Sequence, residues 1–205
     1  MKTFDLNKMN VPEVYKLMIS AIIPRPIAWI STQNKKGQIN LAPFSYFNAV
    51  STKPPCIAVS ITYKKDGEKK DTLINIEETG EFVVNSSTEN LATQINETSA
   101  ALDYGIDEMK KAGLTAIPST LISPPRVKEA LIHMECTLLK SLKLGEPKLG
   151  GCKLIIGEIC AMHVDESILI NGNIDPKALK PLSRLGGLYY GKTNEIFELP
   201  RPKKT

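Results

Sequence analysis

The chain has 205 residues, of which 42% are hydrophobic and 23% are charged. This is the composition of a folded globular domain, and it excludes disordered, collagen-like and low-complexity classes. Lys and Arg total 26 against 22 Asp and Glu, a net charge of +4, but three of these charges lie in residues 200–205 and the fourth in residues 64–71. A broad basic face of the kind that binds nucleic acid is therefore not expected.

The chain carries no signal for a membrane or for secretion. No window approaches the ~20 apolar residues of a membrane helix, and the N-terminus lacks the apolar stretch of a secretory signal. The four cysteines form no C-x-x-C pair and lie among apolar neighbours, which is typical of free, buried thiols in a reducing cytosol. We expect one cytoplasmic domain over residues 1–205 with a mobile basic tail at 200–205, without nucleic-acid or membrane partners.

The first half of the chain predicts one helix followed by strands and short helices. Residues 11–20 form the first helix, because Asn10 can cap it and Glu13 completes a capping box. Alternating hydrophobicity and turn residues predict four strands, at 27–32, 38–45, 56–63 and 81–85, the first two joined as a hairpin. Three short helices are predicted between and after these strands. The helix at 71–78 can be capped by Asp71 or Thr72 and is closed by Gly80. The helix at 86–95 is opened by Ser86 with Glu89, and a third is predicted at 107–112.

The second half is dominated by long strands. Residues 131–144 alternate with period two, which only a strand explains, and a second long strand is expected at 153–164. Two short strands are predicted at 186–190 and 195–199. Because strands mostly follow one another along the chain, a parallel doubly wound sheet is disfavoured. We expect a mainly β fold, an antiparallel barrel, closed or partly closed, with peripheral helices.

Several kinds of catalytic site are absent from the sequence. There is no G-x-G-x-x-G, no P-loop and no G-x-S-x-G, so neither a Rossmann phosphate cradle nor a nucleophile elbow is encoded. The only histidines, His133 and His163, do not lie at metal-ligand spacing, and solvent-facing or hydrogen-bonded strand histidines are the expectation. An enzyme built from this chain would depend on a cofactor for its chemistry and would hold no metal.

Two patterns in the first half carry possible binding chemistry. The first is a set of small polar side chains near the strands, which could line a groove for a polyol, a phosphate or a ring edge. The alternative is that hydroxyl residues are ordinary on the solvent-facing side of a sheet. These side chains are Ser31, Thr32, Asn40, Ser45, Asn48, Ser51, Thr52, Ser60 and Thr62. Residues 69–72 place two ammonium groups and a hydroxyl at a predicted helix start, which suits a phosphate monoester. The alternative for residues 69–72 is a solvated lysine loop before an ordinary helix cap.

Five ordered blocks then resemble a known family. They are PRPIAWIST from Pro24, NLAPFSYFNAVSTKPP from Asn40, KKDTLINIEETGEFVVN from Lys69, SPPRVKEA from Ser123 and PLSRLGGLYY from Pro181. Together they resemble the flavin-reductase-like, FMN-binding split-barrel family, which includes flavoredoxin and is related to reductase components of two-component monooxygenases. One departure is Leu131, where many relatives have proline. The resemblance implies a Greek-key split barrel that forms a homodimer with FMN near the subunit interface.

The resemblance also implies which residues hold FMN. The segment formed by Ala42, Pro43, Phe44, Ser45 and Tyr46 is expected to follow the isoalloxazine ring and ribityl chain. The ribityl and phosphate end is expected at Ser60, Lys70, Asp71 and Thr72, and further contacts at Arg25, Thr32, Asn48 and Arg184. No side chain is expected to be catalytic, because flavin N5 carries the chemistry.

The function that the resemblance implies is an NAD(P)H-dependent FMN oxidoreductase. A reduced nicotinamide would give a hydride to the flavin, and a free flavin or a redox protein would accept the electrons. Two alternatives need the same groove: an electron carrier of the flavoredoxin type, reduced by a protein partner, and a flavin-binding module without turnover.

Overall fold

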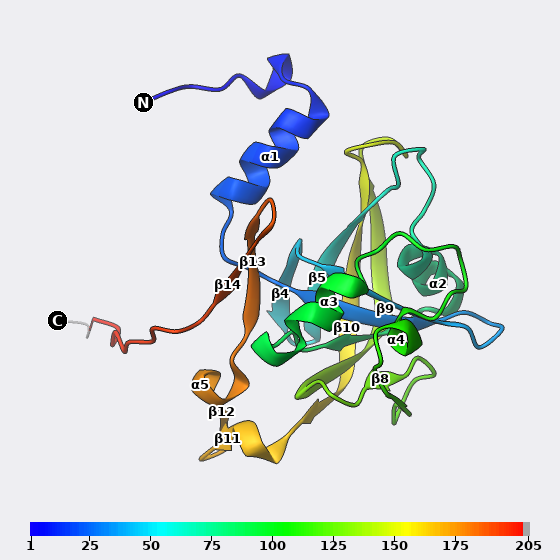
Figure 1. Ribbon diagram of the computed structural model, residues 1–205, viewed down its shortest axis with the longest axis vertical. Helices are drawn as coiled ribbons and strands as arrows, with labels where there is room; N and C mark the ends of the chain where they lie inside the picture. The colour runs from blue at the N-terminus through cyan, green and yellow to red at the C-terminus, as the bar shows by residue number, and fades with distance from the viewer. Residues whose placement is uncertain (203–205) are drawn as a thin grey trace.

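Seven antiparallel strands form the main sheet, in the order β3-β2-β6-β9-β10-β5-β4 (Figure 1). In chain order they are β2 (Ala28–Gln33), β3 (Ile39–Phe44), β4 (Phe47–Thr52), β5 (Pro55–Thr62), β6 (Glu81–Asn85), β9 (Ile132–Leu144) and β10 (Cys152–Val164). The computed structural model describes residues 1–202, so the expected mobile tail at 200–205 lies partly outside the described residues. The predicted hairpin and the two predicted long strands are confirmed.

The sheet curls around a single apolar core, which makes it an open, barrel-like layer. Side chains from β2, β3, β5, β6, β9 and β10 meet in one buried cluster, together with Leu73 and Ile76 of helix α2 (Asp71–Thr79). Gly157 lies where β9 and β10 shift register, and its backbone approaches the buried ring of Phe82. Burying alternate residues of six strands in one core requires this curvature.

A second apolar layer covers the outer face of β2 and β3. Trp29 is fully buried there and donates a hydrogen bond from Nε1 to Thr98 Oγ1 at 2.9 Å. The covering elements are α3 (Ala92–Glu97) and α4 (Glu108–Lys111), both in front of the sheet in Figure 1, with Val127 of the short strand β8 (Arg126–Val127). Strand β8 pairs with the short strand β7 (Ala116–Ile117). The short segments β11 (Leu169–Ile170), β12 (Asn173–Ile174) and α5 (Pro176–Leu179) follow β10.

A small three-stranded sheet stands beside the main one and carries the first helix. It pairs β1 (Arg25–Pro26) with β13 (Leu182–Gly186) and β13 with β14 (Tyr189–Lys192). Helix α1 (Val11–Ala21) has the predicted capping box and stands out from the body next to this sheet (Figure 1). The pairing of β1 with β13 thus joins an early segment of the chain to a late one, more than 150 residues apart in sequence.

Several local predictions are wrong. Strand β4 was not expected, because its residues are exposed at a sheet edge and show no apolar alternation. The strand predicted at 186–190 is interrupted by a turn at Gly187 and Leu188, so that Gly186 ends β13 and Tyr189 begins β14, and residues 195–199 form no strand. The helix expected at 86–95 begins as a 3-10 turn at Glu89–Leu91, because Ser86 Oγ instead accepts bonds from the backbone of Leu131 and Ile132.

Two side-chain predictions also need correction. Helix α2 has Lys70 as its N-cap residue, without a side-chain cap, because Asp71 pairs with Lys64 and Thr72 is turned into the interior. All four cysteines are free, but only Cys56 and Cys136 are buried; Cys152 is half-buried and Cys160 is exposed on the last part of β10. Within residues 1–202, no helix is long and apolar enough to cross a membrane.

Candidate functional site

The end of β3 opens into a groove of about 370 Å³, which we call the β3 groove. Its walls come from β3, from α3 with the residues that follow it, and from the β13–β14 hairpin. The lining residues are Ile27, Pro43, Phe44, Ser45, Ile95, Asn96, Ser99, Arg184, Leu188 and Tyr190. A volume of this size lies within the range of small-molecule sites. Four residues predicted to bind a cofactor, Pro43, Phe44, Ser45 and Arg184, therefore line one groove.

Arg25 supports one wall of this groove through its hydrogen bond to Ser45. The residue is 5% exposed, and its guanidinium donates to the carbonyl oxygens of Ile19 and, at 2.8 Å, Ile22, at the end of α1. Its Nε donates to Ser45 Oγ at 3.3 Å. Because Arg25 is bonded on both sides, it fixes the Ser45 hydroxyl relative to α1. Arg25 contacts the groove wall through Ser45 and does not line the groove itself.

Arg184 forms a cationic wall of the same groove. Its guanidinium lies over the ring of Tyr190, 4.3 Å from the ring centroid, and donates to the carbonyl oxygen of Gly187 at 2.6 Å. The hydroxyl of Tyr190 donates to Asn96 Oδ1 at 3.3 Å. This chain of contacts joins the hairpin to α3 across the groove.

Lys70 lies next to Phe44 and does not line the β3 groove. Its ammonium is 5.5 Å from the centroid of the Phe44 ring, and it stands at the N-cap of α2, where backbone N–H groups are free of helical partners. Burial, together with the nearby Lys64, holds the pKa of Lys70 below its ordinary value of 10.5. A half-buried cation at the positive end of a helix favours an anion such as a phosphate.

The predicted residues Thr32 and Thr72 meet beneath this helix end. Thr72 is 1% exposed and its hydroxyl accepts from Asn40 Nδ2 at 2.8 Å; Thr32 is fully buried and accepts from Asn75 Nδ2 at 3.0 Å. Tyr104 donates in turn to Asn75 Oδ1 at 2.9 Å. The structure thus places both threonine side chains in a buried polar network that supports the start of α2 from within.

Four further predicted residues, Ala42, Tyr46, Asn48 and Ser60, lie on or between β3, β4 and β5. Ala42 packs against the barrel core, and the carbonyl of Tyr46 accepts the backbone N–H of Ser60 at 2.9 Å. Burial, and then the neighbouring Tyr15, raise the pKa of Tyr46. Asn48 is exposed on the edge strand β4. None of these four side chains lines the β3 groove.

The sequence does not indicate six of the ten lining residues. Tyr190 lies in a family-like block but carries no binding motif of its own. Asn96 lies in the short helix α3 and Ser99 follows that helix, again without any binding motif. Ile27, Ile95 and Leu188 are apolar residues whose spacing indicates only a core or a turn. Their common position depends on pairing between distant segments, for which the sequence contains no local signal.

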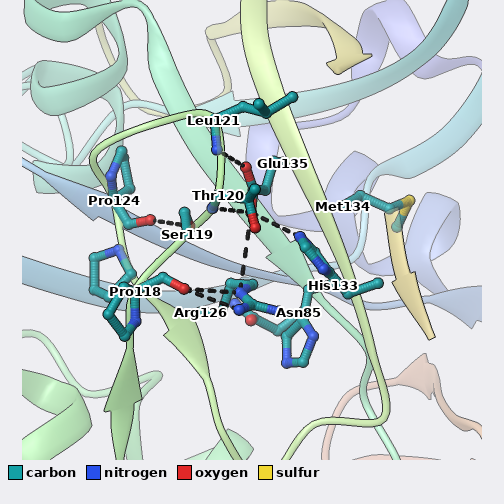
Figure 2. Close-up of polar contacts among 12 residues, drawn as sticks. Asn85, Pro118, Ser119, Thr120, Leu121, Pro124, Arg126, His133, Met134 and Glu135 are labelled. Atoms are coloured by element: carbon teal, nitrogen blue, oxygen red, sulfur yellow. Dashed lines mark hydrogen bonds and ion pairs between the residues drawn. The ribbon is translucent and has the colours of Figure 1, made fainter. Parts of the chain in front are cut away.

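A separate polar cluster surrounds Glu135, which is fully buried on β9 (Figure 2). Its carboxylate accepts from the backbone N–H groups of Thr120 and Leu121 at 2.7 and 2.8 Å and from His163 Nε2 at 2.8 Å. His133 Nε2 lies 2.8 Å from the carbonyl oxygen of Val127. Both histidines are hydrogen-bonded, as expected, and the cluster shares no residue with the β3 groove. Its evident role is to hold the loop of residues 118–126 on the sheet.

Comparison with known proteins agrees with this architecture. The family described as "Flavin reductase like domain" matches residues 19–183. Nitrilotriacetate monooxygenase component B from Bacillus cereus is 44% identical, with a TM-score of 0.92 over 97% of this chain and 98% of that chain. The Pseudomonas fluorescens 2-nitrobenzoate 2-nitroreductase NbaA is 30% identical, with a TM-score of 0.88 over 98% of this chain and 96% of that chain.

A third structure bears on the fold alone. A protein with a split barrel domain from Shewanella frigidimarina is 24% identical and has a TM-score of 0.82, over 96% of each chain. The open, curled sheet described above is thus the split-barrel fold that the sequence predicts. The groove, the fold and the match over residues 19–183 lead to one conclusion: this chain belongs to the flavin-reductase-like family.

Proposed function

We propose that the protein is an FMN-binding oxidoreductase that takes electrons from NAD(P)H and passes them to an acceptor. The observation that carries this proposal is the position of Phe44, which lines the β3 groove and lies next to Lys70 at the start of α2. One residue thus contacts both a slot that could take a ring and a cation that could take a phosphate. FMN has these two ends, and a ribityl chain between them.

The chain's own residues would bind and orient the cofactor. Residues 42–46 would follow the isoalloxazine ring and ribityl chain, with the Ser45 hydroxyl held by Arg25. The phosphate would lie at Lys70 and the first N–H groups of α2, including that of Thr72, because the Thr72 side chain is buried. Ser60, Asp71 and Asn48 remain proposed contacts of the ribityl and phosphate end, and Thr32 would act through the buried network.

When bound, FMN would supply the hydride and electron transfer chemistry. The protein would then contribute position and charge, since no side chain is needed as an acid or base. Arg184 would place positive potential at the ring end of the groove, where it favours an anionic ring. Without a Rossmann motif, the nicotinamide donor would dock against an exposed face with few contacts. Similarity to a nitroreductase and to a monooxygenase component supports a redox role.

A homodimer is part of the proposal. Helix α1 exposes an apolar stripe with helical spacing, formed by Val11, Tyr15, Met18 and Ile22, whose exposed fractions run from 41 to 58%. A second copy of the chain is the occupant that the family resemblance implies for such a surface. Sedimentation should give the mass of two chains, and a Met18→Glu variant should shift it toward one. A wild-type mass of one chain would contradict the dimer.

Turnover with nicotinamides tests the activity. The FMN-loaded protein should oxidise NADH or NADPH with free FMN or ferricyanide as the acceptor. If FMN binds and neither nicotinamide is oxidised, the reductase proposal is wrong. Reduction of the bound FMN by a protein partner would then indicate a flavoredoxin-type carrier. If no protein partner reduces it either, a flavin-binding module without turnover is indicated. If the fluorescence of added FMN is not quenched by the protein, the cofactor assignment itself fails.

A further inference from the structure

Two arginines and a tyrosine form a row across the small sheet. Arg25 on β1 pairs directly with Arg184 on β13, and Arg184 pairs directly with Tyr190 on β14. Side chains of directly opposed residues in antiparallel strands lie on the same face, with Cβ atoms about 4.5–5.5 Å apart. We call these three residues the arginine row. Like charges in such a position repel each other, so the pair needs compensation.

The groups that contact the two guanidiniums are neutral. Arg25 donates to two carbonyl oxygens and to the Ser45 hydroxyl, and Arg184 has one carbonyl oxygen and the face of Tyr190. Among residues 1–202, neither guanidinium has a carboxylate within ion-pair distance. No acidic side chain of the described chain lines the β3 groove either. Arg184, which lines the groove, therefore presents positive charge to it without a carboxylate partner, and the adjacent Arg25 reinforces that charge.

The groove walls define the rest of the ligand. Pro43 and Leu188 provide apolar surface, and Leu188 is 93% exposed at the tip of the hairpin. Asn96 and Ser99 provide polar groups on the α3 side. An apolar slot with one cation at its wall suits a flat apolar ring that carries one negative group. A planar guanidinium that is partly unpaired favours a carboxylate, which it can bind through two parallel hydrogen bonds.

We propose that the hairpin side of the β3 groove binds a planar aromatic carboxylate, held by Arg184. This inference deepens the proposed function, because the ligand would lie beside the isoalloxazine ring that we place along residues 42–46. It identifies the position of a second reactant and its chemical class. Tyr190 acts as a positioning residue, since its ring and its bond to Asn96 hold the guanidinium at the groove wall.

Calorimetric titration of the full chain, with and without saturating FMN, tests the inference. The probes are benzoate, its uncharged analogue benzamide, and inorganic phosphate. The wild-type protein should bind benzoate at least tenfold more tightly than benzamide, and phosphate should not compete with benzoate when FMN is bound. Equal affinities for benzoate and benzamide would overturn the inference. Competition by phosphate would also overturn it, because it would show a general anion site.

Two variants with the same change of charge sharpen the test. Arg184→Gln should abolish the preference for benzoate over benzamide. Lys192→Gln should preserve it, because Lys192 lies on the same hairpin but pairs with Glu89 at 3.3 Å. Arg184→Lys keeps the charge without the planar fork and should retain only part of the preference. If the Lys192 variant loses the preference as fully as the Arg184→Gln variant, the assignment to Arg184 is wrong.

The same experiment separates this inference from the proposed function. FMN affinity is measured for each protein by fluorescence quenching, independently of benzoate. Normal FMN binding without discrimination between benzoate and benzamide refutes only the aromatic carboxylate site. Absence of FMN binding refutes the proposed function, while a benzoate preference measured without FMN would still support the role of Arg184.

Discussion

Replacing Glu135 by glutamine tests whether one buried carboxylate holds the loop of residues 118–126 on the sheet. The carboxylate accepts three hydrogen bonds, from Thr120, Leu121 and His163, and lies 3.9 Å from the guanidinium of Arg126 (Figure 2). Burial opposes its ionisation, but these bonds outweigh burial and lower the pKa of Glu135. The stability it contributes is therefore present above the pKa of an unfolded glutamate and is lost as pH falls through the lower folded value.

The expected loss follows from the number of donors. Glutamine has the shape of glutamate but only one carbonyl oxygen, so its amide N–H₂ must face at least one donor of the cluster. A buried donor left unpaired costs about 1–3 kcal/mol, and a hydrogen bond to a charged group contributes about 1.5–3 kcal/mol. We expect the free energy of unfolding to fall by about 3 kcal/mol. For a domain of this size, the melting temperature would fall by roughly 6–12 °C.

Urea unfolding, followed by the fluorescence of the buried Trp29, measures this loss, and hydrogen exchange at Thr120 and Leu121 locates it. Glu81→Gln is the matched control, because Glu81 accepts a single bond, from the backbone of Ser123 at 2.9 Å in an exposed setting. That variant should lose less than about 1 kcal/mol. The reasoning is refuted if the Glu135 variant loses no more stability than the Glu81 variant.

Three further predictions concern the helix α2 terminus and the core. Lys70→Ala should weaken FMN binding about 10–100-fold in fluorescence titrations and leave riboflavin binding unchanged, since a charge-assisted hydrogen bond contributes about 1.5–3 kcal/mol. Lys69→Ala is the control variant. Equal losses of affinity for both flavins would place the phosphate elsewhere. Burial lowers the pKa of Lys70 below 10.5, so its ammonium loses its proton at a lower pH than that of an exposed lysine. As pH rises, FMN affinity should therefore begin to decline at this lower pH. Parallel pH profiles for FMN and riboflavin would contradict this prediction. Gly157→Ala should cost about 1–3 kcal/mol in urea unfolding, because its Cβ would lie 2.4 Å from Phe82 Cζ, and an unchanged midpoint would disprove the close packing.

The elements that could be predicted are those whose signal is local. The capping box of Asn10 and Glu13 places the start of α1, and alternation over residues 132–144 identifies β9. Strand β4 was missed because an exposed edge strand needs no apolar alternation. On β9, the polar positions His133 and Glu135 follow the alternation of a wet face, yet both are buried, because a loop distant in sequence covers them.

The residues of the candidate site also divide into those with a local sequence signal and those without one. Residues 42–46 and Lys70 belong to continuous blocks, so a family resemblance can suggest them together. The contact of Arg25 with Ser45 and the pairing of Arg25 with Arg184 depend on strands far apart in the chain, and no spacing rule predicts either. The burial of Thr72 could not be foreseen, because a threonine at a helix start reads as an exposed cap in any sequence.

The hairpin that carries Arg184 and Tyr190 straddles the end of the matched family region, because β13 begins at Leu182 and the match ends at residue 183. The strands of the main sheet and the Lys70 end of the site lie within that region, whereas the cation and the ring at the groove wall lie just beyond it. The groove is therefore built from two distant parts of the chain, joined by the pairing of Arg25 with Arg184 and by the bond from Tyr190 to Asn96. A chain shortened at residue 183 would keep all seven strands of the main sheet and lose one whole wall of the groove.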